Sequence, residues 1–258
     1  SGRFMEIGNQ VFMQYRRTED GSFEPLENKN VDFGGGLERI AAAKINNPDV
    51  FQISLMKPII EKLEEISGKN YDENKISMRV IADHLRSATF LAVDGCVPSN
   101  KEQGYVMRKF IRRAMAKAFD LGVEDNFVEQ IVPVIVDIYA PDYKEVASKS
   151  DEIIAVMVKE EKAFRRTLRK GLRELEKFSQ DGLTGVELFQ LYDTFGFPLE
   201  LSTEEAIRRK IPLSKNWREE FDTKMKEQRE RSQTASKGKF KGGLEGQTLE
   251  HRKLHTAT

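Results

Sequence analysis

The hydrophobic period of this sequence changes partway through its first fifty residues. Apolar and polar residues alternate over residues 3–15, RFMEIGNQVFMQY, which predicts a strand. A polar stretch follows, and Asp20-Gly21 within it predicts the turn of a hairpin. A short second strand is expected around Val31. It meets three glycines, Gly34 to Gly36, and a helix is expected to begin at Leu37.

Beyond residue 50 the apolar residues recur every three or four positions, which is the period of a helix. The sequence predicts amphipathic or buried helices over residues 51–66, 77–92, 127–139 and 149–178. Thr184 with Glu187, and Ser202 with Glu205, match the capping-box pattern, and each pair predicts a helix start. A charged helix is expected over 215–231, and residues 236–247 have the composition of a linker. The predicted fold class is mainly α with a small α+β part at the N-terminus.

Positive charge is concentrated in residues 94–119. A turn that ends at Asn100 leads into a helix whose cations recur at steps of one, three and four: Arg108, Lys109, Arg112, Arg113 and Lys117. This spacing predicts one basic stripe, with an apolar seam behind it at Val106, Phe110, Ala114 and Ala118. Clustered like charges cost stability unless an anion faces them, so the stripe is a candidate phosphate-binding surface. A solvated helix face is the alternative.

Two other features carry candidate chemistry. The 149–178 helix has a second basic face, which is either a ligand site or solvated surface: Arg165, Arg166, Arg169, Lys170 and Arg173. Arg39 can reach into the space beside the glycine corner, although plain packing explains such a corner equally well. His84 is expected to be a core histidine rather than a catalytic one.

Composition narrows the function classes. Lys plus Arg (42) equals Asp plus Glu (42), so electrostatic recognition must come from local segregation of charge. The single Cys96 cannot form an internal disulfide, which favours a cytoplasmic location. No run of 18 apolar residues predicts a membrane span, and no signal-peptide layout opens the chain. Both ends have the character of cut ends, which predicts a fragment of a longer protein.

Five strings, in order, resemble the signature of alanyl-tRNA synthetases. They are EIGNQVFMQY, VDFGGGLERIAA, the long VIADHLRSATFLAVDGCVPSNKEQGYVMRKFIRRA, LYDTFGFPLEL and LHTAT. The resemblance covers essentially the whole chain and implies a fragment of an ATP-dependent, class II alanine–tRNA ligase. It implies part of the aminoacylation domain with a remnant of its antiparallel sheet (1–70), a helical tRNA-recognition domain (71–236), and a linker with the start of an editing domain (237–258). The isolated fragment is expected to be inactive.

The resemblance also implies roles for individual residues. Asp32 falls where the family holds the α-amino group of alanine, and a carboxylate suits that ammonium. Val11 and Gly34 fall at the methyl pocket, and Asn9 at a neighbouring polar contact. Arg39, with Gly36 beside it, matches the catalytic arginine that binds ATP phosphate. Mg²⁺ is expected on the ATP phosphates in the parent enzyme.

For RNA, the resemblance implies that Asn100 and Asp193 read a G·U pair in the tRNA(Ala) acceptor stem. Such a pair presents an unpaired amino group in the shallow minor groove, which an amide or carboxylate oxygen can accept. Four cations would hold the stem phosphates: Arg108, Lys109, Arg112 and Arg113. Local helix capping is the alternative role for Asn100 and Asp193. A non-catalytic RNA-binding module, or a scaffold of charged helices, is the alternative for the chain.

The sequence departs from the family pattern at several positions. Gly8 stands where the family usually has tryptophan, which puts the shape of the alanine pocket in question, and Phe33 and Gly35 replace threonine and methionine. His255 matches only the first ligand of an H-x-x-x-H zinc motif, so no complete metal site is expected here, and zinc is expected only in the parent's editing domain. The first two class II motifs would lie upstream.

Overall fold

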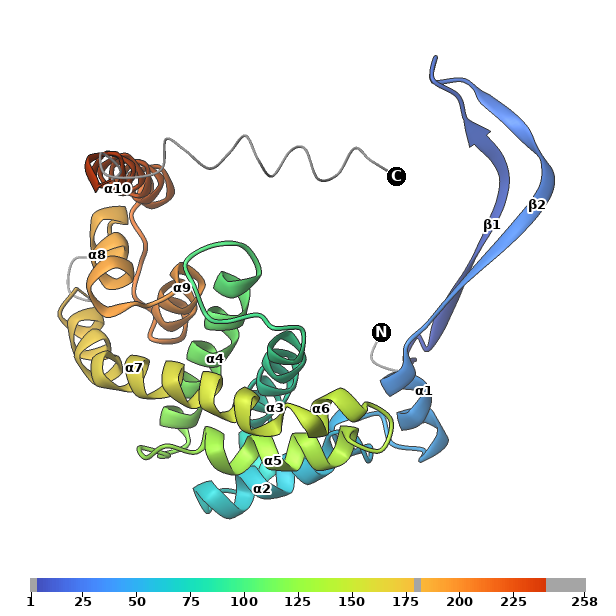
Figure 1. Cartoon of the computed structure of the whole chain (residues 1–258), viewed down its shortest axis with the longest axis horizontal. Helices are drawn as coiled ribbons and strands as arrows, with labels where there is room; N and C mark the ends of the chain where they lie inside the picture. The colour runs from blue at the N-terminus through green and yellow to red at the C-terminus, as the bar shows by residue number, and fades with distance from the viewer. Residues whose placement is uncertain (1–3, 179–181, 240–258) are drawn as a thin grey trace, which may run out of the picture. The chain divides into compact units, whose positions relative to one another are not determined.

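The structure, a computed structural model, describes residues 4–178 and 182–239, with side chains to residue 231. It divides into two compact units, Ser1–Ala163 and Phe164–Thr258. The first unit contains β1 (Gly8–Arg17), β2 (Phe23–Gly35), α1 (Leu37–Lys44), the 3-10 helix η1 (Val50–Gln52), α2 (Lys57–Ser67), α3 (Tyr71–Val93), α4 (Glu102–Asp120), α5 (Val128–Tyr139) and α6 (Lys144–Ser148). Helix α7 (Ser150–Lys177) contributes to both units, and the second unit contains α8 (Gly185–Phe195), α9 (Leu199–Arg208) and α10 (Trp217–Lys239). The predicted fold class is confirmed (Figure 1).

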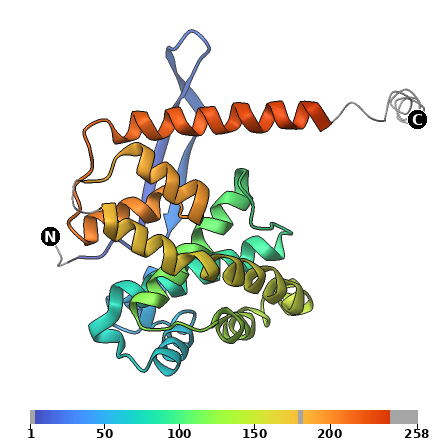
Figure 2. The same ribbon diagram turned by 90° about the vertical axis from the view of Figure 1, so that its left-hand side faces the viewer.

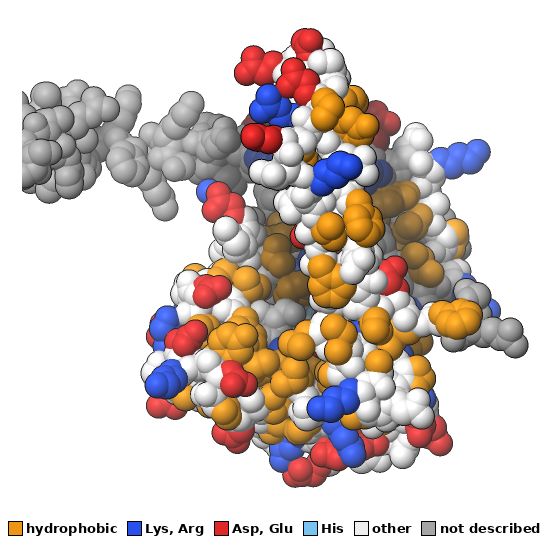
Figure 3. Space-filling view, turned by 90° about the vertical axis from the view of Figure 1, so that its right-hand side faces the viewer, with side chains coloured by type: hydrophobic (Ala, Val, Ile, Leu, Met, Phe, Trp, Pro, Cys, Tyr) orange, Lys and Arg blue, Asp and Glu red, His pale blue; other side chains and the backbone are white. Residues whose placement is uncertain are grey.

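Strands β1 and β2 form an antiparallel hairpin, which Figure 1 shows as a long blue ribbon. Its turn closes where the sequence predicted, with Thr18 N donating to Ser22 O at 3.0 Å and Gly21 at a φ of 86°. Apolar side chains along the ribbon lie in solvent, as Figure 3 shows from the hairpin side. Phe12 is 68% exposed and Phe33 is 61% exposed.

The helical core of the first unit lies where α3 packs against α2, α4 and α5. Six side chains of α3 and α4 are fully buried there: Met78, Ile81, Leu85, Met107, Ile111 and Met115. The apolar seam predicted for α4 is therefore misplaced. Ala114 and Ala118 are buried, but Val106 is 37% exposed, and the methionines and Ile111 make the main contact. The sequence pattern was ambiguous because α4 is covered over more than one stripe.

The second unit is built on close helix packing. The Thr184 capping box at the start of α8 is confirmed, since Glu187 N donates to Thr184 Oγ1 at 3.3 Å and Thr184 N donates to Glu187 Oε2 at 2.8 Å. Gly196 ends α8 at a φ of 69°. Helix α10 packs on α8 (Figure 2), and its Phe221 ring lies 6.2 Å from that of Phe189.

Several predicted boundaries are wrong. The helix expected over residues 51–66 begins only at Lys57, after the 3-10 helix η1, and the short strand expected around Val31 is the 13-residue β2. Ser202 does not cap a helix but lies buried inside α9, because Pro198 occupies the N-cap position four residues earlier. Helix α10 continues to Lys239, so the first residues of the expected linker are helical; the remainder lies outside the described residues. The domain boundaries expected near residues 70 and 236 rest on the resemblance and stay predictions.

Candidate functional site

The four residues expected to contact an amino acid share one face of the hairpin. The register pairs Asn9 with Gly34 and Val11 with Asp32, two neighbouring positions on the same side of the ladder. A Cβ built on Gly34 would find Asn9 Oδ1 as its nearest atom, at 3.7 Å, so a small open space lies above this glycine. The structure thus brings together on one face four residues that are up to 25 positions apart in the sequence.

The three departures from the family pattern lie on the opposite face of the hairpin. Alternation puts Gly8, Phe33 and Gly35 on that side, because each is one residue away from a member of the first face. The Phe33 ring covers both glycines, since a Cβ on Gly8 would meet its Cζ at 2.9 Å and one on Gly35 its Cε1 at 3.0 Å. The Phe33 ring thus occupies the space beside Gly8, on the face opposite Asn9 and Gly34.

The glycine corner positions the predicted ATP residue. Gly36 N donates to Ile7 O at 2.9 Å and extends the strand ladder to the start of α1. The stem of Arg39 lies over Gly36, where a Cβ would approach Arg39 Cδ to 3.2 Å, and its guanidinium donates to Glu6 O at 3.0 Å. Arg39 is exposed. Gly36 and Arg39 are thus in contact, and the guanidinium keeps further donors for an anion.

One positioning contact was missed by sequence reasoning. Arg86 donates to Glu38 Oε1 at 3.0 Å and lies 3.4 Å from the Tyr139 hydroxyl, so it ties α1 to α3 and α5. The pKa of Glu38 is lowered by its own backbone N–H at the start of α1 and by Arg86, while partial burial opposes this. The sequence did contain a signal for this contact, because Arg86 is a charged residue within a largely apolar helix.

Asn100 lies exposed on a loop that α4 holds in place. Arg108 donates to Asn100 Oδ1 and, at 3.4 Å, to Pro98 O. Ser99 N donates to Gly104 O at 3.0 Å. The side chain of Asn100 is therefore oriented by a cation rather than used as a helix cap, and Lys101 is the N-cap of α4.

The basic stripe of α4 is not an open surface. Glu160 of α7, 8% exposed, takes both Arg112 Nη2 at 2.5 Å and Arg108 Nε at 3.3 Å. Arg113 lies 3.3 Å from His84 Nε2, and Lys117 is only 3% exposed. Lys109 lies over the Tyr105 ring at 5.9 Å. These cations thus take part in the packing of α4 against α3 and α7, and the phosphate-binding role expected of Arg108, Lys109, Arg112 and Arg113 stays a prediction.

His84 is a core histidine, as expected from the sequence. It is 8% exposed, its ring packs 4.9 Å from that of Phe110, and its Nδ1 lies 3.0 Å from Asp83 Oδ2. The hydrogen bond with His84 lowers the pKa of Asp83, with burial opposing and Arg86 and Arg113 adding to the effect.

Asp193 lies exposed near the end of α8, in the second unit. The amide of Gln228 in α10 donates to Asp193 Oδ1, so the carboxylate is oriented by a neighbouring helix. Both residues expected to read a base pair, Asn100 and Asp193, are thus exposed, and each has one oxygen held by a partner from a nearby helix.

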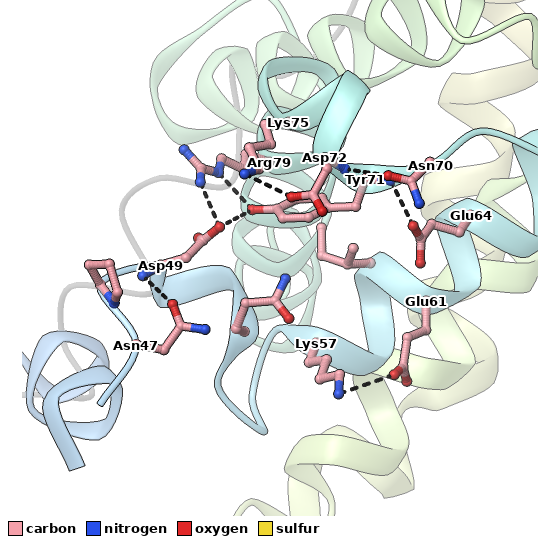
Figure 4. A pocket seen from close by; sticks show the side chains of 13 residues that line it. Asn47, Asp49, Lys57, Glu61, Glu64, Asn70, Tyr71, Asp72, Lys75 and Arg79 are labelled. Atoms are coloured by element: carbon pink, nitrogen blue, oxygen red, sulfur yellow. Dashed lines mark hydrogen bonds and ion pairs between the residues drawn. The ribbon is translucent and has the colours of Figure 1, made fainter. Parts of the chain in front are cut away.

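A cavity of about 610 Å³ lies beside η1, α2 and the start of α3 (Figure 4). Its charged residues are paired with one another: Arg79–Asp49 at 2.7 Å, Lys75–Asp72 at 2.8 Å and Lys57–Glu61 at 3.7 Å. Glu64 accepts from Tyr71 N at 2.6 Å. These pairs leave the cavity without a charge directed at a ligand, so its charged side chains serve to hold η1, α2 and α3 together.

Two further observations concern metals and membranes. His255 lies outside the described residues. Within the part of the chain that the structure describes, no three His, Cys, Asp or Glu side chains gather as metal ligands. None of the helices described has the length and apolar character that crossing a membrane requires.

The family model for tRNA synthetases class II (A) matches residues 1–258. The chain therefore belongs to the class II tRNA synthetases, as the sequence motifs predicted.

Its curated relatives specify the kind of synthetase that the chain is similar to. It is 43% identical over 238 residues to the alanine–tRNA ligase of Haemophilus influenzae, 40% over 266 residues to that of Borrelia hermsii, and 39% over 257 residues to that of Pediococcus pentosaceus. These alignments cover 91%, 100% and 96% of this chain, but 27%, 44% and 29% of the relatives. The chain thus spans less than half the length of these relatives.

Proposed function

We propose that this chain is the part of an alanine–tRNA ligase that contributes amino-acid and ATP contacts and recognises the tRNA(Ala) acceptor stem. The observation that carries the proposal is the hairpin register. It places Asn9, Val11, Asp32 and Gly34, each assigned to alanine by its own motif position, in two adjacent pairs on one face.

The chemistry of this face suits alanine. The Asp32 carboxylate would accept from the α-ammonium group, and Gly34, which has no side chain, leaves room for a methyl group. Arg39, exposed and steadied by Glu6 O, would bind an ATP phosphate. Mg²⁺ would enter bound to the ATP phosphates.

Recognition of the acceptor stem would depend on Asn100 and Asp193. Asp193 offers its second carboxylate oxygen, and Asn100 the second lone pair of its amide oxygen, to the unpaired amino group of a G·U pair. Both side chains are exposed. Arg108 and Gln228 hold these two side chains in fixed orientations, which favours reading a base edge over binding any phosphate.

The test compares binding of two acceptor-stem RNA hairpins, identical except for a G·U or a G·C pair. The unchanged chain should prefer the G·U hairpin, and Asp193→Ala or Asn100→Ala should reduce that preference by about tenfold or more. Asp222→Ala, which removes another exposed carboxylate of the second unit, is the matched control. Two results would contradict the proposal. One is equal binding of the two hairpins by the unchanged chain, and the other is a G·U preference in Asp193→Ala as strong as in the unchanged chain.

A further inference from the structure

We propose that three cations on the exposed side of α7, Arg166, Lys170 and Arg173, bind the phosphate backbone of duplex RNA. We call them the α7 basic face. The inference rests on the proposed function, because it names the surface that holds the RNA while Asn100 and Asp193 read it.

Local sequence concentrates positive charge at this face. Residues 164–173, FRRTLRKGLR, contain five cations and no acid in a chain whose net charge is zero. Arg166, Lys170 and Arg173 follow one another at steps of four and three, so they lie in one row about 10 Å long on the helix. All three are exposed.

The other side of the same segment is firmly packed within the second unit. Phe164 and Leu168 are each 1% exposed, and no space remains beside Gly171, where a Cβ would lie 2.3 Å from Phe197 Cε2. Thr167 Oγ1 donates to Phe195 O at 2.8 Å. Helix α7 therefore cannot rotate about its axis, and the three cations are held outward.

The fold does not use these cations, in contrast with those of α4. In α4, Arg108 and Arg112 bind Glu160. At the end of α9, Arg209 binds Glu176 at 2.6 Å and Glu205 at 3.3 Å. Within residues 4–178 and 182–231, no carboxylate lies in ion-pair range of Arg166, Lys170 or Arg173. An outside anion can therefore bind them without breaking an internal pair.

RNA fits this face better than a membrane or an acidic protein. Membrane binding needs an apolar side to insert, but the apolar side of α7 is buried at Phe164, Leu168 and Leu172. Thr167, next to Arg166, contacts Phe195, two residues beyond Asp193, so cations and the base-reading carboxylate belong to one packed unit. In nucleic-acid recognition, cations bind the phosphates while a nearby hydrogen-bond acceptor, here the Asp193 carboxylate, contacts a base edge.

The test measures binding of the G·U acceptor-stem hairpin at several salt concentrations. In the triple variant Arg166→Gln/Lys170→Gln/Arg173→Gln, binding should weaken about tenfold or more, and the slope of log affinity against log salt should become shallower by roughly three. The ratio of G·U to G·C binding should stay unchanged, because phosphates carry no sequence information. The matched control, Lys215→Gln/Arg218→Gln/Lys226→Gln, removes the same charge from exposed positions of the same unit.

The outcomes separate the two proposals. An unchanged slope in the α7 variant, or an equal loss in the control, would overturn the α7 basic face. So would complete competition by polyglutamate at the charge concentration of the RNA, which would indicate an acidic protein partner. If the unchanged chain shows no G·U preference but the triple variant still has a shallower salt slope, only the proposed function is contradicted. Should the triple variant melt earlier than the unchanged chain, Lys170→Gln alone should reduce the slope by about one.

Discussion

Gly104 is the residue whose missing side chain shapes the loop that carries Asn100. A Cβ there would lie 2.2 Å from Ser99 Oγ and 2.5 Å from Val97 O. The second contact is with backbone, which cannot move aside by a rotamer change. The position of Asn100 thus depends on a glycine that is buried in the first turn of α4.

Gly104→Ala should displace residues 97–101 and reduce the G·U preference in hairpin binding, at a stability cost of about 1–3 kcal/mol for overpacking. Gln103→Ala, an exposed neighbour in the same turn, is the control and should change neither quantity. A crystal structure of Gly104→Ala with the Asn100 loop unmoved would refute this account.

Tyr71 is a second residue whose surroundings predict a measurable effect. Burial, and then the hydrogen bond to Asp49, raise the pKa of Tyr71 to about 12, with Arg79 opposing the shift. Because the folded pKa lies above the unfolded value of about 10, the tyrosine stabilises the fold fully below pH 10, and this contribution is lost between about pH 10 and 12.

Tyr71→Phe should therefore lose about 1 kcal/mol at neutral pH and show a flatter decline of stability above pH 10 than the unchanged chain. Urea unfolding at a series of pH values measures both. Tyr143→Phe, an exposed tyrosine, serves as the control. Parallel alkaline declines for Tyr71→Phe and the unchanged chain would contradict the assignment.

At the scale of elements, Glu160 joins α7 to α4. One nearly buried carboxylate is shared by two arginines, whose side chains are 22% and 13% exposed. A buried pair of this kind contributes little net stability, but removing one partner leaves the other charge uncompensated. The α4 cations are consequently constrained by packing, whereas those of the α7 basic face are constrained only by the helix that carries them.

Glu160→Gln should reduce the free energy of unfolding by about 3 kcal/mol, because Arg108 and Arg112 lose the buried charge that they share. Glu152→Gln, an exposed change in the same helix, should stay within about 0.5 kcal/mol. Chemical denaturation of the two variants provides the comparison. Equal stability of both would mean that the α4 cations are solvated after all.

At the scale of the whole molecule, the hairpin has two exposed faces and the chain spans less than half of its relatives' length. In this chain, Arg39 of α1 is the one cation that we assign to ATP. We therefore expect the 258-residue chain alone to bind acceptor-stem RNA weakly and to form no alanyl-adenylate. ATP–pyrophosphate exchange with alanine measures this directly, and robust exchange by the isolated chain would disprove it.

Local sequence predicted most elements because their signals are short-range. The hairpin turn, the Thr184 capping box and the Gly196 helix end each depend on residues within a few positions of one another. Ser202 was misassigned for the same reason, since its capping pattern is as good as that of Thr184, and only the preceding Pro198 decided where α9 begins. The predicted site residues were found by motif, but their partners were not.

The sequence by itself determined the hydrophobic periods, the turns and the family of this protein, because these are properties of neighbouring residues. Tertiary structure alone decided which side chain fills the space beside each hairpin glycine and which cations the fold pairs with carboxylates. Glu160 stands about 50 residues from Arg108 and Arg112, and Phe33 about 25 from Gly8. No pattern along the chain reports such contacts, since charge pairing and ring packing depend on distance in space.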